Sequence, residues 1–118
     1  NRQFNGESFN FGPSPDNDYT VKELVKSMSL FWDKVSWVDV SRDIKGPYES
    51  NLLKLNCDKA LHFLNWLPTW DFNETVRETA KWYQEYYTKE PVSIFDFTSK
   101  QIDLYTSDAK LQNRAWAK

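Results

Sequence analysis

Two pairs of residues mark the starts of helices and most constrain how this chain can fold. Thr20 precedes Glu23 by three positions, and Asp71 precedes Glu74 by the same spacing. In such a capping pair the first side chain accepts a hydrogen bond from a backbone N–H of the first helical turn. Apolar residues recur at helical spacing behind each pair: Val21, Leu24, Val25, Met28 and Phe31 or Trp32, then Phe72, Val76, Ala80, Tyr83 and Tyr87. The sequence therefore predicts two amphipathic helices, the second ending near Tyr87.

Two short segments that favour extended structure flank the first helix. Residues 8–11 alternate polar and apolar side chains until Gly12 and Pro13 end the pattern, and residues 37–40 are rich in β-favouring types. A strand, a helix and a second strand in this order form a βαβ unit with parallel strands and a right-handed crossover. We therefore expect a small parallel sheet before the later helices.

A short helix is predicted after the polar loop 41–50. Asn56 can cap a helix over residues 57–64. This helix ends at Asn65, because asparagine tolerates the left-handed conformation that a helix C-cap requires.

A last short helix is predicted to run from a cap at Thr98, with Gln101 three positions later, through Tyr105. The predicted fold class is then α+β, a mostly helical lobe with a small parallel sheet (the βαβ unit) followed by two or three helices. One domain spans residues 1–106, and residues 107–118 form a polar tail.

The charge balance and the single cysteine narrow the class of protein. The 118 residues carry 15 Lys and Arg against 17 Asp and Glu, which argues against nucleic-acid binding by phosphate neutralisation. No apolar run approaches the roughly 20 residues of a membrane span, and no charged-then-apolar leader opens the chain. Cys57, the only cysteine, leaves no internal disulfide. A soluble cytoplasmic domain is predicted, with neither nucleic acid nor membrane as a partner.

No set of residues matches a catalytic or metal-binding pattern. His62, the only histidine, has no second histidine or Ser/Asp pattern beside it, so a structural role is favoured over catalysis. One His and one Cys cannot fill a tetrahedral metal site. Cys57 lies in a first helical turn, where the helix dipole can lower the pKa of a thiol. Because the sequence offers no partner thiol or imidazole, we favour a structural role as a small buried residue. The three glycines stand too far apart to form a phosphate-binding loop.

Aromatic residues make up 17% of the chain. They could form a platform on which a base or sugar ring stacks. We favour a place in the hydrophobic core for most of them, because each ring buries a large apolar area.

The side chains of the loop 41–50 could contact a ligand in several different ways. Arg42 and Lys45 could meet a phosphate, Tyr48 could stack on a ring, and Glu49 could accept hydrogen bonds from ribose hydroxyls. Taken alone, the pattern is more typical of an ordinary solvated loop.

Three segments follow one another in a familiar order: residues 51–60, 63–70 and 76–83. They resemble the C-terminal portion of the extended short-chain dehydrogenase/reductases that modify nucleotide sugars. In that superfamily the pattern runs Leu-Asp-x-Ser-Lys-Ala, then Leu-Gly-Trp-x-Pro, then a helix ending Thr-x-x-Trp-Tyr. The CDP-glucose 4,6-dehydratases are the most similar members, and three further segments support this: residues 6–13, 49–55 and 99–102. The resemblance covers roughly residues 5–105.

The resemblance implies a substrate-binding lobe for a nucleotide sugar such as CDP-glucose, in a parent lyase that makes CDP-4-keto-6-deoxyglucose. Family members hold NAD in an N-terminal half with a Gly-x-x-Gly-x-x-Gly turn and a catalytic Tyr-x-x-x-Lys pair, and neither pattern occurs here. We therefore expect no cofactor in this chain, NAD in the missing dinucleotide-binding domain, and no catalysis by this chain alone.

The resemblance also ranks the loop residues. In related epimerases an acidic residue at the position of Glu49 contacts ribose, so Glu49 is the first candidate for substrate binding. Tyr48, Arg42 and Lys45 follow.

Trp66, Trp70, Trp82 and Tyr83 lie in the segments that carry the resemblance. Most of them are therefore expected to be core or interface residues, and Tyr48 is the one aromatic kept as a ligand candidate.

Two alternatives stay open. The chain could be a non-catalytic interaction domain that keeps the fold of the lobe, or the same lobe from an epimerase or dehydratase that uses another nucleotide sugar. A lobe that packs on a second domain should expose apolar surface, so self-association is also expected. Met28 is the only methionine, which fits a processed chain or a piece of a longer one.

Overall fold

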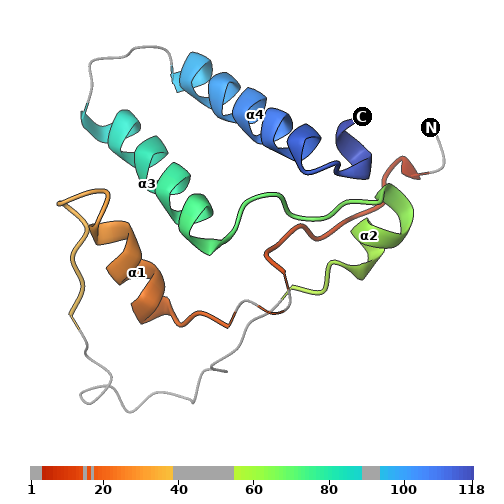
Figure 1. The fold of residues 1–118 in the computed structure, drawn as a ribbon. Coiled ribbons are helices and arrows are strands. Elements are labelled where there is room, and N and C mark those ends of the chain that lie inside the picture. The colour runs from red at the N-terminus through yellow and green to blue at the C-terminus, as the bar shows by residue number, and fades with distance from the viewer. Residues whose placement is uncertain (1–3, 15, 17, 39–54, 89–93) are drawn as a thin grey trace.

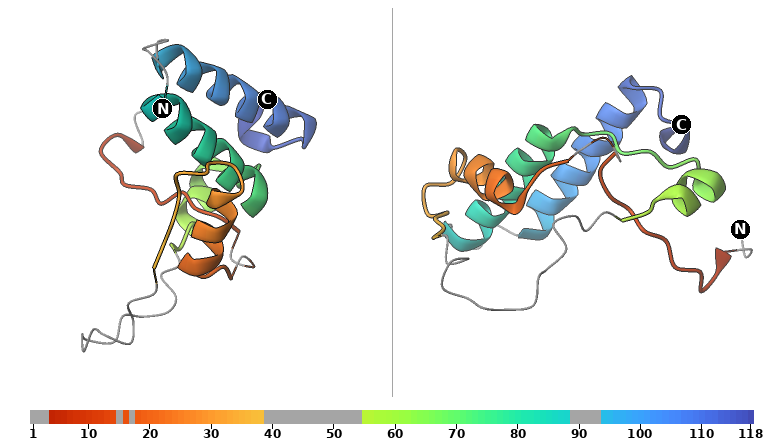
Figure 2. Two further views of the ribbon diagram at one scale, coloured as in Figure 1. Left: turned by 90° about the vertical axis from the view of Figure 1, so that its left-hand side faces the viewer. Right: turned by 90° about the horizontal axis from the view of Figure 1, so that it is seen from below.

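The computed structural model describes residues 4–14, 16, 18–38, 55–88 and 94–118. These residues form α1 (Val21–Ser29), α2 (Asp58–Leu64), α3 (Phe72–Thr88), α4 (Ile94–Leu111) and the short 3₁₀ helix η2 (Ala115–Ala117) (Figure 1). In views from different directions α3 lies between α1 and α4, while α2 sits to one side (Figures 1 and 2).

Both predicted capping pairs are present. The Thr20 hydroxyl accepts a hydrogen bond from the Glu23 N–H (3.2 Å), and the Glu23 carboxylate accepts one from the Thr20 N–H (2.8 Å). The Asp71 carboxylate accepts a hydrogen bond from the Glu74 N–H at 2.8 Å. α1 and α3 therefore begin where the sequence predicts, because each cap is made by residues only three positions apart.

The predicted ends of α2 are confirmed to within one residue. The side-chain oxygen of Asn56 accepts a hydrogen bond from the N–H two residues on (2.8 Å), where the helix begins. Asn65 is left-handed (φ 51°), and the next N–H donates to the carbonyl of Ala60 at 3.2 Å. The end of α4 repeats this arrangement, since Asn113 is left-handed (φ 55°) and the next N–H donates to the carbonyl of Ala109 at 2.8 Å.

α4 is longer than predicted. It begins before Thr98 and continues past Tyr105, into the segment 107–118 that was expected to be a polar tail. Thr98 is not a cap: its hydroxyl donates to the carbonyl of Ile94 (2.7 Å) and accepts from the indole N–H of Trp82 (2.9 Å). A threonine that bonds back to the preceding turn is satisfied without ending the helix, which is why the cap prediction failed here.

The prediction of an α+β fold is wrong for the described residues, which contain helices and no strand. Residues 8–11 have no partner strand within the described ranges. Instead the rings of Phe9 and Phe11 contact those of Phe4 and Trp66, with centroids 6.0 and 5.0 Å apart. An extended segment needs a neighbour for its backbone groups before it becomes a strand, and here its alternating rings pack against a helix and its flanking loop.

The second strand of the predicted βαβ unit is also missing from the part of the chain that is described. Residues 37 and 38 form no strand, and residues 39–40 lie outside the described ranges. The ring of Trp37 instead lies 5.3 Å from the ammonium of Lys22, on α1. This residue therefore folds back on the helix that was predicted to separate two strands.

Ring contacts fix the direction of α1 along α3. Tyr19, before α1, stacks on Phe72 at the start of α3 with centroids 3.6 Å apart. Trp32, after α1, stacks on Tyr87 near the end of α3 at 5.8 Å. The two helices therefore run in the same direction.

Polar side chains join α3 to α4. The indole of Trp82 donates to Thr98, and the amide of Gln101 donates to the backbone carbonyl of Glu78 at 2.8 Å. Because a later position on α4 pairs with an earlier one on α3, these helices run antiparallel.

The loop before α3 is fixed to α4 and η2 by three hydrogen bonds. The Thr69 N–H donates to the Tyr105 hydroxyl (3.1 Å), and the Trp70 indole donates to the Asp108 carboxylate (2.7 Å). The Trp116 indole donates to the carbonyl two residues before Thr69, at 3.2 Å. We call residues 67–70 the anchored segment.

The buried core is small. Trp66, Trp70 and Trp82 are half-buried and Tyr83 is 41% exposed, so the aromatic residues expected in the core lie at its edge. Among the residues that the structure describes, the buried apolar ones are Ala60, Val76, Ala80, Ala109 and Ala117.

Replacing Asn65 by alanine should lower the free energy of unfolding by about 1 kcal/mol, because alanine is strained in the left-handed conformation. Asn65→Gly should be at least as stable as the wild type. Urea unfolding followed by circular dichroism measures both. Asn73→Ala, on an exposed position of α3, is the matched control and should lose no stability. An Asn65→Ala variant as stable as the wild type would contradict the proposed role of the cap.

The apolar surface of α4 should drive self-association. Phe95 and Ile102 lie seven residues apart on one side of the helix and are 75% and 61% exposed. Light scattering should show association that rises with concentration, and Phe95→Ser with Ile102→Ser should reduce it. A wild-type chain that stays monomeric at high concentration would count against this expectation.

Candidate functional site

The four loop residues predicted to bind substrate cannot be placed. Arg42, Lys45, Tyr48 and Glu49 all lie outside the described residues, within the range 39–54. Their role stays a prediction from the sequence and from the family resemblance.

The remaining candidates from the sequence do not form a reactive centre. His62 is exposed on α2, with its ring against Phe63 at 4.7 Å. The Cys57 thiol is half-buried and lies 3.7 Å from the carbonyl of Leu55. In the ranges that the structure describes, no three His, Cys, Asp or Glu residues are close enough to hold a metal ion.

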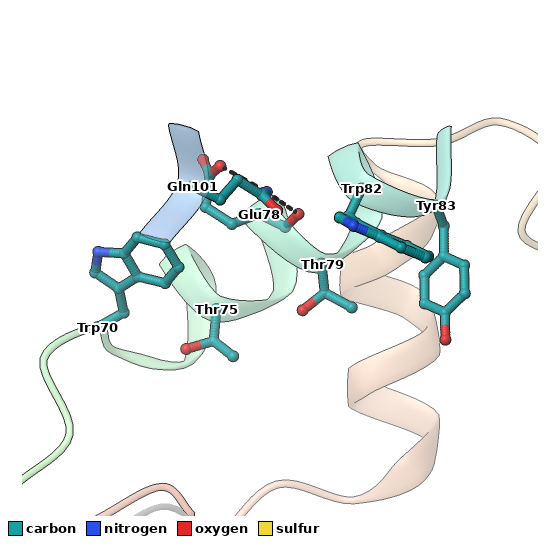
Figure 3. Close-up of a pocket in the computed structure, with 7 residues that line it drawn as sticks. All are labelled: Trp70, Thr75, Glu78, Thr79, Trp82, Tyr83 and Gln101. Atoms are coloured by element: carbon teal, nitrogen blue, oxygen red, sulfur yellow. Dashed lines mark hydrogen bonds between the residues drawn. The ribbon is translucent and has the colours of Figure 1, made fainter. Parts of the chain in front are cut away.

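A cavity of about 300 Å³ lies along α3, next to α4 (Figure 3). Most of its lining residues lie on one face of α3, where side chains three or four positions apart are neighbours. The anchored segment contributes one further residue, and α4 contributes another. The lining residues are Trp70, Thr75, Glu78, Thr79, Trp82, Tyr83 and Gln101.

Glu78 is the buried charge of this cavity, with only 6% of its side chain exposed. Its carboxylate accepts hydrogen bonds from Lys81 Nζ (2.8 Å) and Arg77 Nε (3.1 Å), both on α3. Gln101 on α4 adds a third donor at 3.3 Å. Burial raises the pKa of Glu78, but these hydrogen bonds and the charge of Lys81 outweigh burial and lower the pKa below its usual value. The carboxylate is therefore held ionised and is poorly suited to act as a general acid.

Aromatic rings close the two ends of the cavity. In Figure 3, Trp70 lies at one end and Trp82 with Tyr83 at the other, with Thr75 and Thr79 between them. Both indole N–H groups are already used, since Trp70 donates to Asp108 and Trp82 donates to Thr98. Ring surfaces and threonine hydroxyls are what this cavity offers to a ligand, which suits non-covalent binding.

A second cavity, of about 430 Å³, lies on the other side of the anchored segment. It is lined by residues 12–14, the start of α2, residues 66–71 and Arg114. Trp70 lines both cavities.

Sequence reasoning missed both cavities. Thr75, Glu78, Thr79 and Trp82 share one face of α3. The sequence predicted Trp82 as a core or interface residue and gave none of the other three a role in binding. Arg114 fell in the segment expected to be a polar tail. The asparagine at 113, which resembles Asn65 in position, was the one local indication that the chain turns back there.

A comparison with known proteins links the chain to one enzyme. Over 102 residues it is 35% identical to CDP-glucose 4,6-dehydratase of Salmonella typhimurium (strain LT2). The similarity supports a relationship at the level of the family. It takes in 86% of this chain and 27% of that dehydratase, so the chain spans about a quarter of the length of the relative it matches. No family model matches the chain, and no solved structure does.

The length and hydropathy of the helices bear on whether they could span a membrane. None of those in the described ranges is long and apolar enough to cross a bilayer.

The lowered pKa of Glu78 predicts a loss of stability in acid. A carboxylate with a lowered pKa in the folded state contributes stability above its unfolded pKa, near 4.5, and this contribution is lost as the pH falls through the folded value. The free energy of unfolding should therefore fall below about pH 4.5. Glu78→Gln should lower stability at pH 7 and reduce its dependence on pH in this window.

Asp103→Asn, on an exposed position of α4, is the control and should keep the wild-type pH profile. Urea unfolding between pH 3 and pH 7 measures all three proteins. An unchanged pH profile for Glu78→Gln would contradict the assignment of the effect to this carboxylate.

Proposed function

We propose that this chain is the nucleotide-sugar-binding part of an enzyme similar to CDP-glucose 4,6-dehydratase. The observation that carries the proposal is the 35% identity to that enzyme over 86% of the chain. In the proposed parent reaction CDP-glucose is oxidised at C4, water leaves across C5 and C6, and the hydride returns to C6, giving CDP-4-keto-6-deoxyglucose.

In this proposal the chain binds substrate and does not catalyse the reaction. A Cβ added at Gly6 would meet open space, and one added at Gly12 would lie against the side chains of Cys57 and Leu55. Neither glycine opens a helix, so no helix N-terminus is presented to a pyrophosphate there. The hydride chemistry accordingly belongs to a dinucleotide-binding domain with which this chain would pack.

Four residues of the loop 41–50 are proposed to hold the nucleotide. Glu49 would accept hydrogen bonds from the ribose hydroxyls, and Tyr48 would stack on a ring. Arg42 and Lys45 would neutralise phosphate charge. Each role is proposed from the chemistry of the side chain and from the resemblance of the neighbouring segments to the dehydrogenase/reductases that modify nucleotide sugars.

A second candidate function is a non-catalytic interaction domain with the same fold. The exposed apolar side chains favour it, because Phe95, Ile102 and Leu111 of α4 are 75%, 61% and 81% exposed. Such a surface suits packing against another protein domain whether or not a nucleotide sugar is bound. Binding measurements separate the two functions.

Calorimetric titration of the chain with CDP-glucose, UDP-glucose and dTDP-glucose tests the proposal. CDP-glucose should bind more tightly than the other two. Equal binding of all three would contradict the CDP assignment. The interaction domain would be favoured if this chain bound none of the three nucleotide sugars and if changes to its residues did not affect their binding by the parent enzyme.

Glu49→Ala in the full-length parent should weaken CDP-glucose binding about tenfold or more, because it removes a charged hydrogen-bond acceptor. Asp103→Ala removes an exposed carboxylate of α4 and is the control, with affinity expected to stay at the wild-type value. Unchanged affinity in Glu49→Ala would show that this residue does not contact the ribose.

A further inference from the structure

Asn5 and Gly6 form a dipeptide with a chemical reactivity of its own. The side-chain amide carbon of an asparagine can be attacked by the backbone nitrogen of the following residue, which closes a five-membered succinimide ring. The attacking nitrogen is least crowded when the following residue is glycine, because glycine has no Cβ. Asn5 is followed by Gly6, whereas each of the other asparagines in the chain is followed by a residue with a Cβ.

The two residues occupy the exposed corner of a turn. The Glu7 N–H donates to the carbonyl of Phe4 at 3.1 Å, so Asn5 and Gly6 are the two central residues of a β-turn. Gly6 has a φ of 85°, a conformation that glycine adopts without strain. Both central residues are exposed, and a Cβ added at Gly6 would meet no atom within 4 Å. The turn therefore leaves room for the ring to close and for water to reach it.

Two other asparagines are held in place by hydrogen bonds. The side-chain amide of Asn10 donates to the carbonyl of Asn56 at 3.3 Å, and the side-chain oxygen of Asn56 accepts from the Asp58 N–H at 2.8 Å. A reaction within one chain depends on how readily the two reacting groups reach their geometry of attack. In Asn10 and Asn56, crowding by the Cβ of the next residue is joined by a hydrogen bond that restrains the side chain.

We propose that Asn5 is a site of spontaneous modification in the folded chain, with isoaspartate and aspartate as the products. Ring closure forms a bond between the Gly6 nitrogen and the side-chain carbon of Asn5, the Gly6 nitrogen gives up its proton, and ammonia leaves. Water then adds to one of the two ring carbonyls and breaks its bond to the nitrogen. The net reaction consumes one water and releases one ammonia, with no oxidation or reduction. Either product replaces a neutral amide with a carboxylate.

The residues on the two sides of this turn hold the N-terminal segment to α2. The ring centroid of Phe4 lies 5.4 Å from that of Phe63 on α2. The Glu7 carboxylate accepts a hydrogen bond from Lys59 Nζ, also on α2, at 2.6 Å. The same ammonium lies 4.9 Å from the ring centroid of Phe9. The turn between Phe4 and Glu7 therefore sets the spacing of two contacts with one helix.

Isoaspartate changes this spacing. Its main chain passes through the side-chain carbon, so one methylene is added to the backbone between Phe4 and Glu7. The ring contact and the ion pair with α2 then no longer form together in their native geometry. The new carboxylate also lies two residues from Glu7 in the chain and repels it. Conversion to isoaspartate therefore loosens the N-terminal segment from α2.

Incubation of the folded chain in mildly alkaline buffer, followed by mass spectrometry of its peptides, tests the proposal. The peptide that contains Asn5 should gain the mass difference between an NH₂ and an OH group. Isoaspartyl methyltransferase with S-adenosylmethionine should then label this peptide. Absence of conversion at Asn5, conversion that requires urea, or faster conversion at another asparagine would overturn the proposal.

Three variants test the mechanism. Asn5→Gln should block the conversion, because its side chain would have to close a six-membered ring. Gly6→Ala should slow it severalfold or more, because the Cβ crowds the attacking nitrogen. Asn73→Gln removes an exposed asparagine of α3 and is the matched control, with conversion at the wild-type rate. Conversion as fast in Gly6→Ala as in the wild type would contradict attack by this nitrogen.

The purified isoaspartate form tests the structural consequence. Nuclear Overhauser contacts between the rings of Phe4 and Phe63 should be lost in this form. They should be kept in Asn5→Asp, which carries the same charge on an unaltered backbone. Contacts that persist in the isoaspartate form, or that are lost equally in Asn5→Asp, would overturn the inferred effect of the longer backbone.

Discussion

The hydrogen bonds from α4 and η2 to the anchored segment determine much of the arrangement of this chain. The bond from the Trp70 indole to the Asp108 carboxylate is the shortest of the three and involves a charged acceptor, which makes such bonds strong. α3 begins two residues after Trp70. The direction in which α3 leaves the segment is therefore tied to the end of α4, and both cavities are built around the same few residues.

Polar side chains of α3 and α4 contact each other directly. Glu78 with Gln101, and Trp82 with Thr98, occupy positions where two packed helices often place large apolar side chains. Hydrogen bonds are directional, so these pairs specify how one helix is aligned along the other. The apolar residues that are buried between the elements are mostly alanines, which allow close approach but remove little surface from water.

The sequence was most informative where a structure depends on residues only a few positions apart. The caps at Thr20 and Asp71 and the turn at Asn65 are of this kind. The predicted sheet failed because the ring of Phe11 packs against Trp66, a contact between distant parts of the chain that alternation alone does not indicate.

The same limit applies to α4 and to the sites. A threonine such as Thr98 can cap a helix or bond within one, and its partner across the helices decides which. The cavities form where segments distant in the chain meet, so no short sequence motif predicts them. For the loop residues Arg42 to Glu49, the sequence and its resemblance remain the whole basis of the prediction.

Trp70 is a wall of both cavities, so the two cavities share one boundary. A ligand that shifts the indole in one cavity also changes the shape of the other, and the hydrogen bond to Asp108 limits how far the ring can move. Such coupling is reciprocal: whatever factor one ligand imposes on the affinity of the second, the second imposes on the first. If each cavity took a ligand, this shared side chain would couple the two binding events.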